Sequence, residues 1–111
     1  MAQRFAGVVV DIAKLRDYCL STTHPRGRHK ARVIASRLGL TAEDAPLLRR
    51  ALLDAVQAGD QDLQASATDA HGQRYVLDFA MTTPVGAATI RSTWMVLTGD
   101  DVLRLTSCYL L

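Results

Sequence analysis

Apolar residues recur at helical spacing through the first half of the chain, and this pattern predicts helices there. The helices are expected over residues 11–20, 28–38 and 42–58. Residues at the ends of these segments support the boundaries. Asp11 suits the N-cap of the first helix, and Gly39 suits the end of the second. Thr41 followed by Asp44 resembles a capping box that starts the third helix.

The spacing changes to every second position near Asp62, which predicts β-strands through the rest of the chain. The strands are expected over residues 73–82, 87–97 and 102–110, with another before the turn at His71-Gly72. Short connections favour antiparallel pairing between neighbours in the sequence. The sequence therefore predicts one α+β domain over residues 1–111, with N-terminal helices packed on one face of a four-stranded antiparallel meander sheet.

Alternation along the last two strands assigns their side chains to two faces of the sheet. The apolar face carries Ile90, Trp94, Val96, Leu103, Leu105 and Tyr109. The opposite face carries Arg91, Thr93, Arg104, Thr106 and Cys108. The Trp94 indole is the largest apolar group of the chain, so we expect it to be buried against helical residues such as Leu48 and Leu52. The polar face then points away from the helices, as a functional patch or as an ordinary solvated surface.

Composition places the chain among soluble globular proteins, because 49% of its residues are apolar and 22% are charged. No apolar run approaches the roughly 18–20 residues that a membrane helix needs, and none suits a signal peptide. The two cysteines, Cys19 and Cys108, cannot form the dense disulfide framework of a small secreted scaffold. We therefore expect a cytoplasmic protein with no membrane partner.

Positive charge is concentrated in one segment, although the formal net charge is only +2. No acidic residue occurs between Asp17 and Glu43. That interval contains Arg26, Arg28, Lys30, Arg32 and Arg37, together with His24 and His29. Such a segment suits contact with an anionic partner such as RNA. A solvated helix face with no binding role is the alternative.

Motifs for phosphate loops, dinucleotides and zinc proteases are missing from the sequence. It contains no G-x-x-x-x-G-K-[ST], no G-x-G-x-x-G and no H-E-x-x-H. His24 and His29 lack a convincing third and fourth ligand, and the two cysteines do not form a C-x-x-C pair. We therefore expect no metal ion and no cofactor.

Four short motifs follow one another along almost the whole chain. They are H-P-x-G-x-x-K-A at residues 24–31, L-G-x-T at 38–41, R-x-x-W-x-[VI] at 91–96 and R-L-[VT]-[TS]-x-Y at 104–109. In this order the sequence resembles a small uncharacterised bacterial domain family. Its members look like stand-alone small proteins or C-terminal modules of polymorphic toxins. Their order of helices and strands is similar to the ribonuclease fold of barnase, EndoU, colicins and RelE.

The resemblance implies a catalytic site shared between the helical and the strand half of the chain. Its candidate residues are His24, Lys30, Arg91, Arg104 and Thr106. Further contacts to nucleic acid are expected from Arg26, Arg28, Arg32 and Thr93. RNA cleavage without a metal requires a base for the 2′-hydroxyl proton, cations for the charge on phosphate and an acid for the leaving oxygen.

Each candidate suits one part of that reaction. Histidine titrates near neutral pH, so His24 is expected to act as the base. Lys30 and Arg91 are expected to hold the phosphate, Arg104 to stabilise the transition state and Thr106 to position the substrate. Lys30 also lies in the first turn of its helix, where backbone N–H groups favour an anion.

Two departures from the family bear on this prediction. Val33 and Ile34 stand where the family usually has an aromatic residue, which affects packing more than chemistry. No carboxylate matches the glutamate base of barnase.

The predicted function is therefore RNA cleavage by a toxin-like domain, in its own cytoplasm or after delivery to that of a target cell. RNA and a cognate antitoxin or immunity protein are its expected partners. The alternative is a non-catalytic binding module, such as a phage inhibitor or an immunity-type protein. Its basic patch would dock nucleic acid or an acidic protein.

Overall fold

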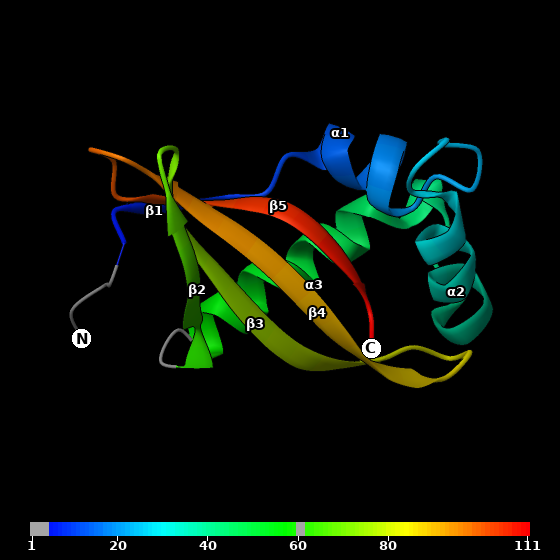
Figure 1. The fold of residues 1–111 in the computed structure, drawn as a ribbon. Helices are drawn as coiled ribbons and strands as arrows, with labels where there is room; N and C mark the ends of the chain where they lie inside the picture. The colour runs from blue at the N-terminus through cyan, green and yellow to red at the C-terminus, as the bar shows by residue number, and fades with distance from the viewer. Residues whose placement is uncertain (1–4, 60–61) are drawn as a thin grey trace.

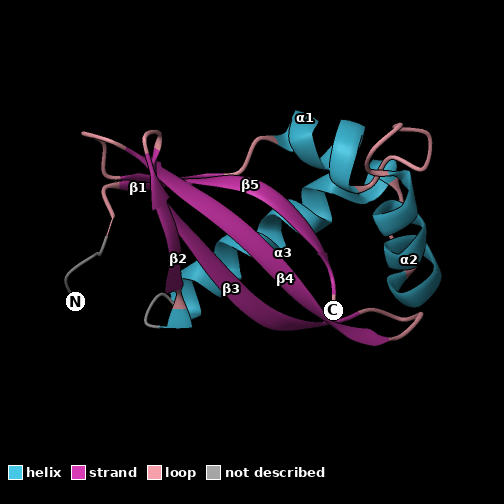
Figure 2. Ribbon diagram, in the orientation of Figure 1, coloured by secondary structure: helices cyan, strands magenta, loops and turns pink. Residues whose placement is uncertain are grey.

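A short first strand, the helices and then four further strands follow one another in the computed structural model, which describes residues 5–59 and 62–111 (Figures 1 and 2). The elements in chain order are strand β1 (Gly7–Val9), helix α1 (Ile12–Lys14), π-helical turn η1 (Leu15–Cys19), helix α2 (Arg28–Leu38), 3-10 turn η2 (Ala42–Asp44), helix α3 (Ala45–Gly59) and strands β2 (Gln64–Asp69), β3 (Gly72–Thr82), β4 (Ala87–Leu97) and β5 (Val102–Leu110). No helix in this described part combines the length and apolar character that a membrane crossing requires.

The sheet has five strands in the order β1-β5-β4-β3-β2 and is mixed. Strands β2 to β5 form the expected antiparallel meander, whereas β1 runs parallel to β5, with Gly7 opposite Val102. The prediction of a four-stranded antiparallel sheet was therefore wrong in number and in pairing. A strand of three residues is too short to show an alternating pattern. The general α+β class is confirmed.

Helix α3 covers one face of the sheet and supplies the main helical contribution to the core (Figure 1). Its buried side chains are Ala45, Leu48, Leu52 and Val56, which follow helical spacing. Trp94 is 0% exposed and belongs to the same core cluster as Leu48 and Leu52. The expected burial of Trp94 is thus confirmed. Figure 1 shows α2 at the end of the sheet, beside the C-terminal half of β5.

The helix ends largely agree with the sequence signals. Asp11 accepts a hydrogen bond from the Ala13 N–H at 2.9 Å, and Gly39 ends α2 with a φ of 69°. The Asp44 carboxylate accepts from the Thr41 N–H at 2.8 Å, as in a capping box. The first helix differs from the single helix predicted over residues 11–20, because α1 passes into the π-helical turn η1.

A β-bulge in β5 reverses the faces of its last residues. Thr93 pairs with Ser107 and Trp94 pairs with Leu105, so Thr106 is an extra residue without a partner on β4. After this point the alternation is shifted by one position. Cys108 consequently points into the core, where it is 2% exposed, and not to the polar face as the unbroken alternation predicted.

Candidate functional site

Arg91 and Asp78 form a two-bond ion pair on the sheet face that turns away from α3. The Arg91 Nε and Nη2 donate to the two Asp78 carboxylate oxygens, each at 2.9 Å, and the residues are direct partners across β4 and β3. These hydrogen bonds lower the pKa of the Asp78 carboxyl and raise the pKa of the Arg91 guanidinium. Arg91 is therefore a fixed cation with a fixed orientation.

Tyr109 lies on this outer face because of the bulge, opposite Arg91 in the register of β4 and β5. This corrects the prediction that Tyr109 shares the apolar face with Leu105. Lys30 of α2 places its Nζ 4.2 Å from the centre of the Tyr109 ring. We call Lys30, Asp78, Arg91 and Tyr109 the junction cluster, since it joins side chains of the helical and strand halves.

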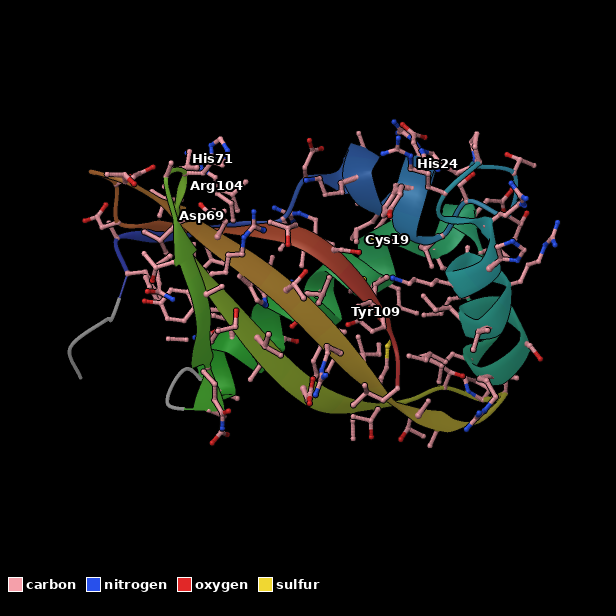
Figure 3. The ribbon with its side chains drawn as sticks, viewed as in Figure 1. Cys19, His24, Asp69, His71, Arg104 and Tyr109 are labelled. Atoms are coloured by element: carbon pink, nitrogen blue, oxygen red, sulfur yellow. The ribbon has the colours of Figure 1, made fainter. Side chains whose placement is uncertain are left out.

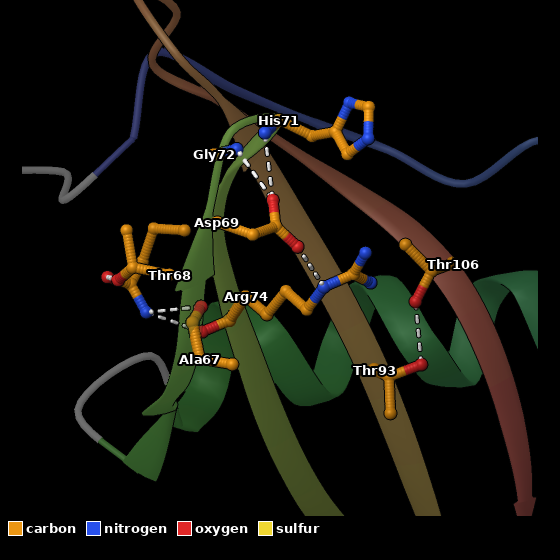
Figure 4. A network of polar contacts seen from close by, with 9 residues as sticks. Ala67, Thr68, Asp69, His71, Gly72, Arg74, Thr93 and Thr106 are labelled. Atoms are coloured by element: carbon orange, nitrogen blue, oxygen red, sulfur yellow. Dashed lines mark hydrogen bonds and ion pairs between the residues drawn. The ribbon is translucent and has the colours of Figure 1, made fainter.

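The hydroxyls of Thr93 and Thr106 share a hydrogen bond of 2.7 Å across β4 and β5 (Figure 4). Thr93 also donates to the Ser107 carbonyl at 3.2 Å, which fixes the pair at the bulge. Thr93 is two positions from Arg91 on the same face of β4. The Thr93 and Thr106 hydroxyls therefore lie beside Arg91 along the outer face of the sheet.

Arg104 lies toward the other end of the outer face and has a carboxylate partner there. Its Nη2 is 3.6 Å from the Asp100 carboxylate. Nearby in Figure 3 are Asp69 and His71, at the turn between β2 and β3. The Asp69 carboxylate accepts from the His71 backbone N–H at 2.8 Å and pairs with Arg74 at 3.2 Å, and these bonds lower its pKa.

His24 and Arg104 are well separated in Figure 3, with His24 in the loop before α2. About five strand residues, or roughly 16 Å, separate the backbone of Arg104 from that of Tyr109. The predicted single concavity that includes His24, Lys30, Arg91 and Arg104 is therefore not seen as one contiguous group of side chains. The catalytic roles of these residues stay predictions.

His24 organises the turn that begins α2. Its Nδ1 accepts hydrogen bonds from the backbone N–H groups of Arg26 and Gly27, at 3.0 and 3.1 Å. Its ring packs edge-on against Tyr18, with 4.7 Å between ring centres. Because Nδ1 is the acceptor, the neutral imidazole carries its hydrogen on Nε2. A Cβ at Gly27 would come within 2.7 Å of the Tyr18 carbonyl, so the H-P-x-G motif has a local structural reason.

The basic side chains of α2 and its preceding loop differ from the arginines of the sheet. Arg91, Arg104 and Arg74 each pair with an aspartate. Among the described residues, no carboxylate pairs with the cations of the basic segment, which are Arg26, Arg28, Lys30, Arg32 and Arg37. This surface keeps its positive charge available to an anionic partner.

A shallow pocket lies outside the junction cluster. It is lined by Val10, Ile12, Pro46 and Arg49, and none of the predicted site residues belongs to that lining. Within residues 5–59 and 62–111, no three histidine, cysteine, aspartate or glutamate side chains are grouped so as to share a metal ion.

Sequence reasoning missed Tyr109 and Asp78 as site residues. Unbroken alternation placed Tyr109 on the wrong face, because the extra residue Thr106 has no signature in the hydrophobic pattern. A signal was nevertheless present, since Tyr109 ends the R-L-[VT]-[TS]-x-Y motif. Asp78 became visible only once the register placed it opposite Arg91.

Comparison with solved structures finds a similar fold in a chain of a contact-dependent growth inhibition toxin and immunity protein complex from Klebsiella pneumoniae 342. The TM-score is 0.71 at 19% sequence identity, and the match covers 93% of this chain and 99% of that chain. This likeness concerns the fold alone. No curated protein matches the sequence.

A family model matches nearly the whole chain, over residues 3–111. The family is described as a domain of unknown function. The chain therefore belongs to the DUF6883 family.

Proposed function

We propose that this chain is a metal-independent ribonuclease domain of toxin type, which cleaves RNA at the junction cluster. One observation carries the proposal: Lys30 from the basic helix lies over the ring of Tyr109, which is the cross-strand partner of Arg91. Thr93, two positions from Arg91 on β4, shares a hydrogen bond with Thr106. A cation of the helical half thereby meets a guanidinium and hydroxyls of the strand half, as the resemblance to toxin ribonucleases implies.

The cations of the junction cluster suit the phosphate of the scissile bond. Arg91 presents a rigid planar guanidinium, and Asp78 holds it through Nε and Nη2. That leaves Nη1 free of this pair for a phosphate oxygen. Lys30 is exposed and has no carboxylate partner in the described part of the chain, so its ammonium can neutralise a second oxygen. Together they would stabilise the charge that develops in the transition state.

Proton transfer requires a group that both donates and accepts, and Tyr109 is such a group within the cluster. Its half-buried ring lies under Lys30, and Tyr109 is the cross-strand partner of Arg91. We assign to it the exchange of a proton with the substrate. His24 was predicted as the base, yet its Nδ1 already accepts two backbone hydrogen bonds. In this proposal His24 supports the reaction by shaping the loop that precedes Lys30.

The similar fold in the Klebsiella pneumoniae 342 complex adds independent support for a role in toxin biology. That complex consists of a contact-dependent growth inhibition toxin and its immunity protein. By analogy, a cognate protein would bind this chain and restrain it. A purely binding role is the second candidate, favoured by the basic residues of α2 that pair with no described carboxylate.

The proposal is tested by incubating the purified full chain with total RNA in EDTA. Cleavage is expected, and Tyr109→Phe should lower its rate by about 10²- to 10⁴-fold, the usual contribution of a general acid or base. This variant keeps the ring under Lys30 and removes only the hydroxyl. RNA affinity should stay close to that of wild type, because the cations remain.

His24→Asn separates the structural from the catalytic role of His24. An asparagine side-chain oxygen can accept the same backbone N–H bonds, so cleavage should persist. Loss of cleavage in a folded His24→Asn protein would return the base role to the imidazole. Arg50→Ala is the control for loss of a single surface charge, since this exposed arginine lies on α3, outside the junction cluster, and is 3.8 Å from the Asp54 carboxylate. Its rate of RNA cleavage should equal that of wild type. Binding of RNA without any cleavage by the wild type would favour the binding module instead.

A further inference from the structure

Two arginines lie on the outer face of the sheet, away from the junction cluster. Arg74 of β3 and Arg104 of β5 are the cross-strand partners of Met95 on β4, so the three residues form one row across the sheet. Met95 is on the face opposite Trp94, and it is nevertheless only 7% exposed. The apolar stems of its two arginine neighbours account for this burial. The arginines therefore lie over Met95, one on each side of it.

Both guanidinium groups keep donors that their aspartate partners do not use. Asp69 accepts from the Nε of Arg74 at 3.2 Å, which leaves both Nη atoms outside this bond. Asp100 lies 3.6 Å from a single nitrogen of Arg104, Nη2. The Arg74 and Arg104 side chains are 42% and 45% exposed, so their ends reach solvent. Figure 4 shows the Arg74 guanidinium extending from β3 toward β4 and β5.

We propose that Arg74 and Arg104, the arginine pair, bind a second phosphate of the RNA strand that is cleaved at the junction cluster. Adjacent strands lie about 4.8 Å apart, so the two backbones are separated by roughly 10 Å across β4. Two arginine side chains can reach one phosphate across that gap, and the guanidinium fork matches phosphate oxygens. This inference rests on the proposed function, because it takes the cleaved RNA as the ligand.

The spacing along β4 separates this site from the scissile phosphate. Arg91 of the junction cluster precedes Met95 by four residues, which is about 13 Å along the strand. One phosphate cannot contact Arg91 and the arginine pair at once, whereas two phosphates of one strand can. Thr93 is midway between Arg91 and Met95, and its hydroxyl bonds that of Thr106. A row of polar groups therefore connects the two sites.

An RNA strand suits this row better than an acidic protein does. Phosphates repeat along a strand, and the outer face offers cations at two places with hydroxyls between them. Threonine hydroxyls are common donors to phosphate and sugar oxygens. A single strand can follow a surface of this kind, where cations track its backbone. The arginine pair thereby extends the binding surface to nucleotides beyond the cleaved bond.

Asp69 and Asp100 hold the arginine pair in the free protein and compete with the phosphate for it. Each carboxylate offsets one guanidinium charge, so repulsion between the two arginines is reduced when no RNA is bound. A phosphate at this site has to share the cations with the aspartates. Removal of a carboxylate is therefore expected to strengthen RNA binding.

The test measures how affinity depends on RNA length. The probes are 2′-O-methyl oligouridylates, which lack the attacking 2′-hydroxyl and stay intact: a dinucleotide with one internucleotide phosphate, and a hexanucleotide. We expect the wild type to bind the hexanucleotide more tightly. In Arg74→Gln/Arg104→Gln this gain should shrink by roughly tenfold. The slope of log K against log [salt] for the hexanucleotide should become shallower by about 0.7, the value for one phosphate of a single strand.

Glutamine keeps part of each stem over Met95, and an unchanged thermal midpoint verifies the fold of the double variant. Arg50→Gln is the matched control, because Arg50 is also an exposed arginine beside an aspartate but lies on α3. It should retain the full gain in affinity with length.

Asp100→Asn tests the competition. Asparagine can still accept the Asp101 N–H through its side-chain oxygen, while the negative charge is gone. Affinity for the hexanucleotide should rise by about twofold to fivefold, as expected for loss of one exposed ion pair. An unchanged or lower affinity would contradict this part of the proposal.

A length gain as large in the double variant as in the wild type would overturn the second phosphate site. So would a wild type that binds the hexanucleotide no better than the dinucleotide, or an equal loss of affinity for both probes. Cleavage of unmodified RNA is measured in parallel. Arginine-dependent hexanucleotide binding by a wild type that cuts no RNA would refute the proposed function alone. Cutting without an arginine-dependent gain would refute the second phosphate site alone.

Discussion

Ser92 gives the sharpest stability prediction, because it joins two hydrogen bonds at a fully buried position. Its hydroxyl donates to the Leu77 carbonyl at 2.7 Å and accepts from the Trp94 indole N–H at 2.8 Å. Both Ser92 and Trp94 are 0% exposed. Ser92→Ala would leave the indole N–H without a partner and without water. A stranded buried donor costs about 1–3 kcal/mol.

We therefore expect Ser92→Ala to lower the free energy of unfolding by about 2 kcal/mol, which corresponds to about 8–16 °C in thermal midpoint. Urea denaturation measures it, with an unchanged dependence on denaturant as the sign that the unfolded state is unaltered.

A double-mutant cycle identifies the cause. In a Trp94→Phe background the donor is already gone, so Ser92→Ala should cost about 1 kcal/mol less than in the wild type. A loss below about 0.5 kcal/mol for Ser92→Ala alone would refute this reasoning. Additive effects of the two substitutions would show that the indole N–H is not responsible.

Two further predictions concern a helix end and an ion pair. Gly39→Ala should destabilise the protein by about 1–3 kcal/mol, since φ is 69° there and the new Cβ would lie 2.5 Å from a Val85 methyl group; a urea midpoint equal to wild type would contradict this. Hydrogen bonds from Arg91 lower the pKa of Asp78, so the pair's contribution to stability is present above the unfolded pKa of about 3.9 and is lost as pH falls through the lower folded value. Asp78→Asn should remove this part of the stability–pH curve, as measured by urea denaturation between pH 2 and pH 6. An unchanged acid limb would show that the pair contributes nothing.

Long periodic segments made most of the fold predictable from the sequence. The β3, β4 and β5 boundaries, the capping box at Thr41 and the end of α2 at Gly39 all follow from local physical rules. Strand β1 did not, because three residues carry no period and its parallel pairing with β5 is a tertiary contact. The π-helical turn η1 also has no distinct sequence pattern.

The candidate site was predictable in its residue types and less so in its arrangement. Lys30 and Arg91 were expected together, and the structure links both to Tyr109. The bulge at Thr106 determines which side of the sheet Tyr109 and Cys108 face. A single extra residue hardly changes the alternation of apolar and polar positions along the strand, so the sequence pattern does not reveal it.

The most direct test of the proposed function is the chemistry of the cleaved ends. The full chain, in EDTA, is given an RNA oligonucleotide that it cleaves and the same oligonucleotide with one 2′-deoxy substitution at the cleaved position. The junction cluster predicts 2′,3′-cyclic phosphate ends on the RNA and no cut at the substituted position, because the 2′-hydroxyl is the attacking group. Equal cleavage of both, or an RNA that stays intact in the presence of active, folded protein, would contradict the account.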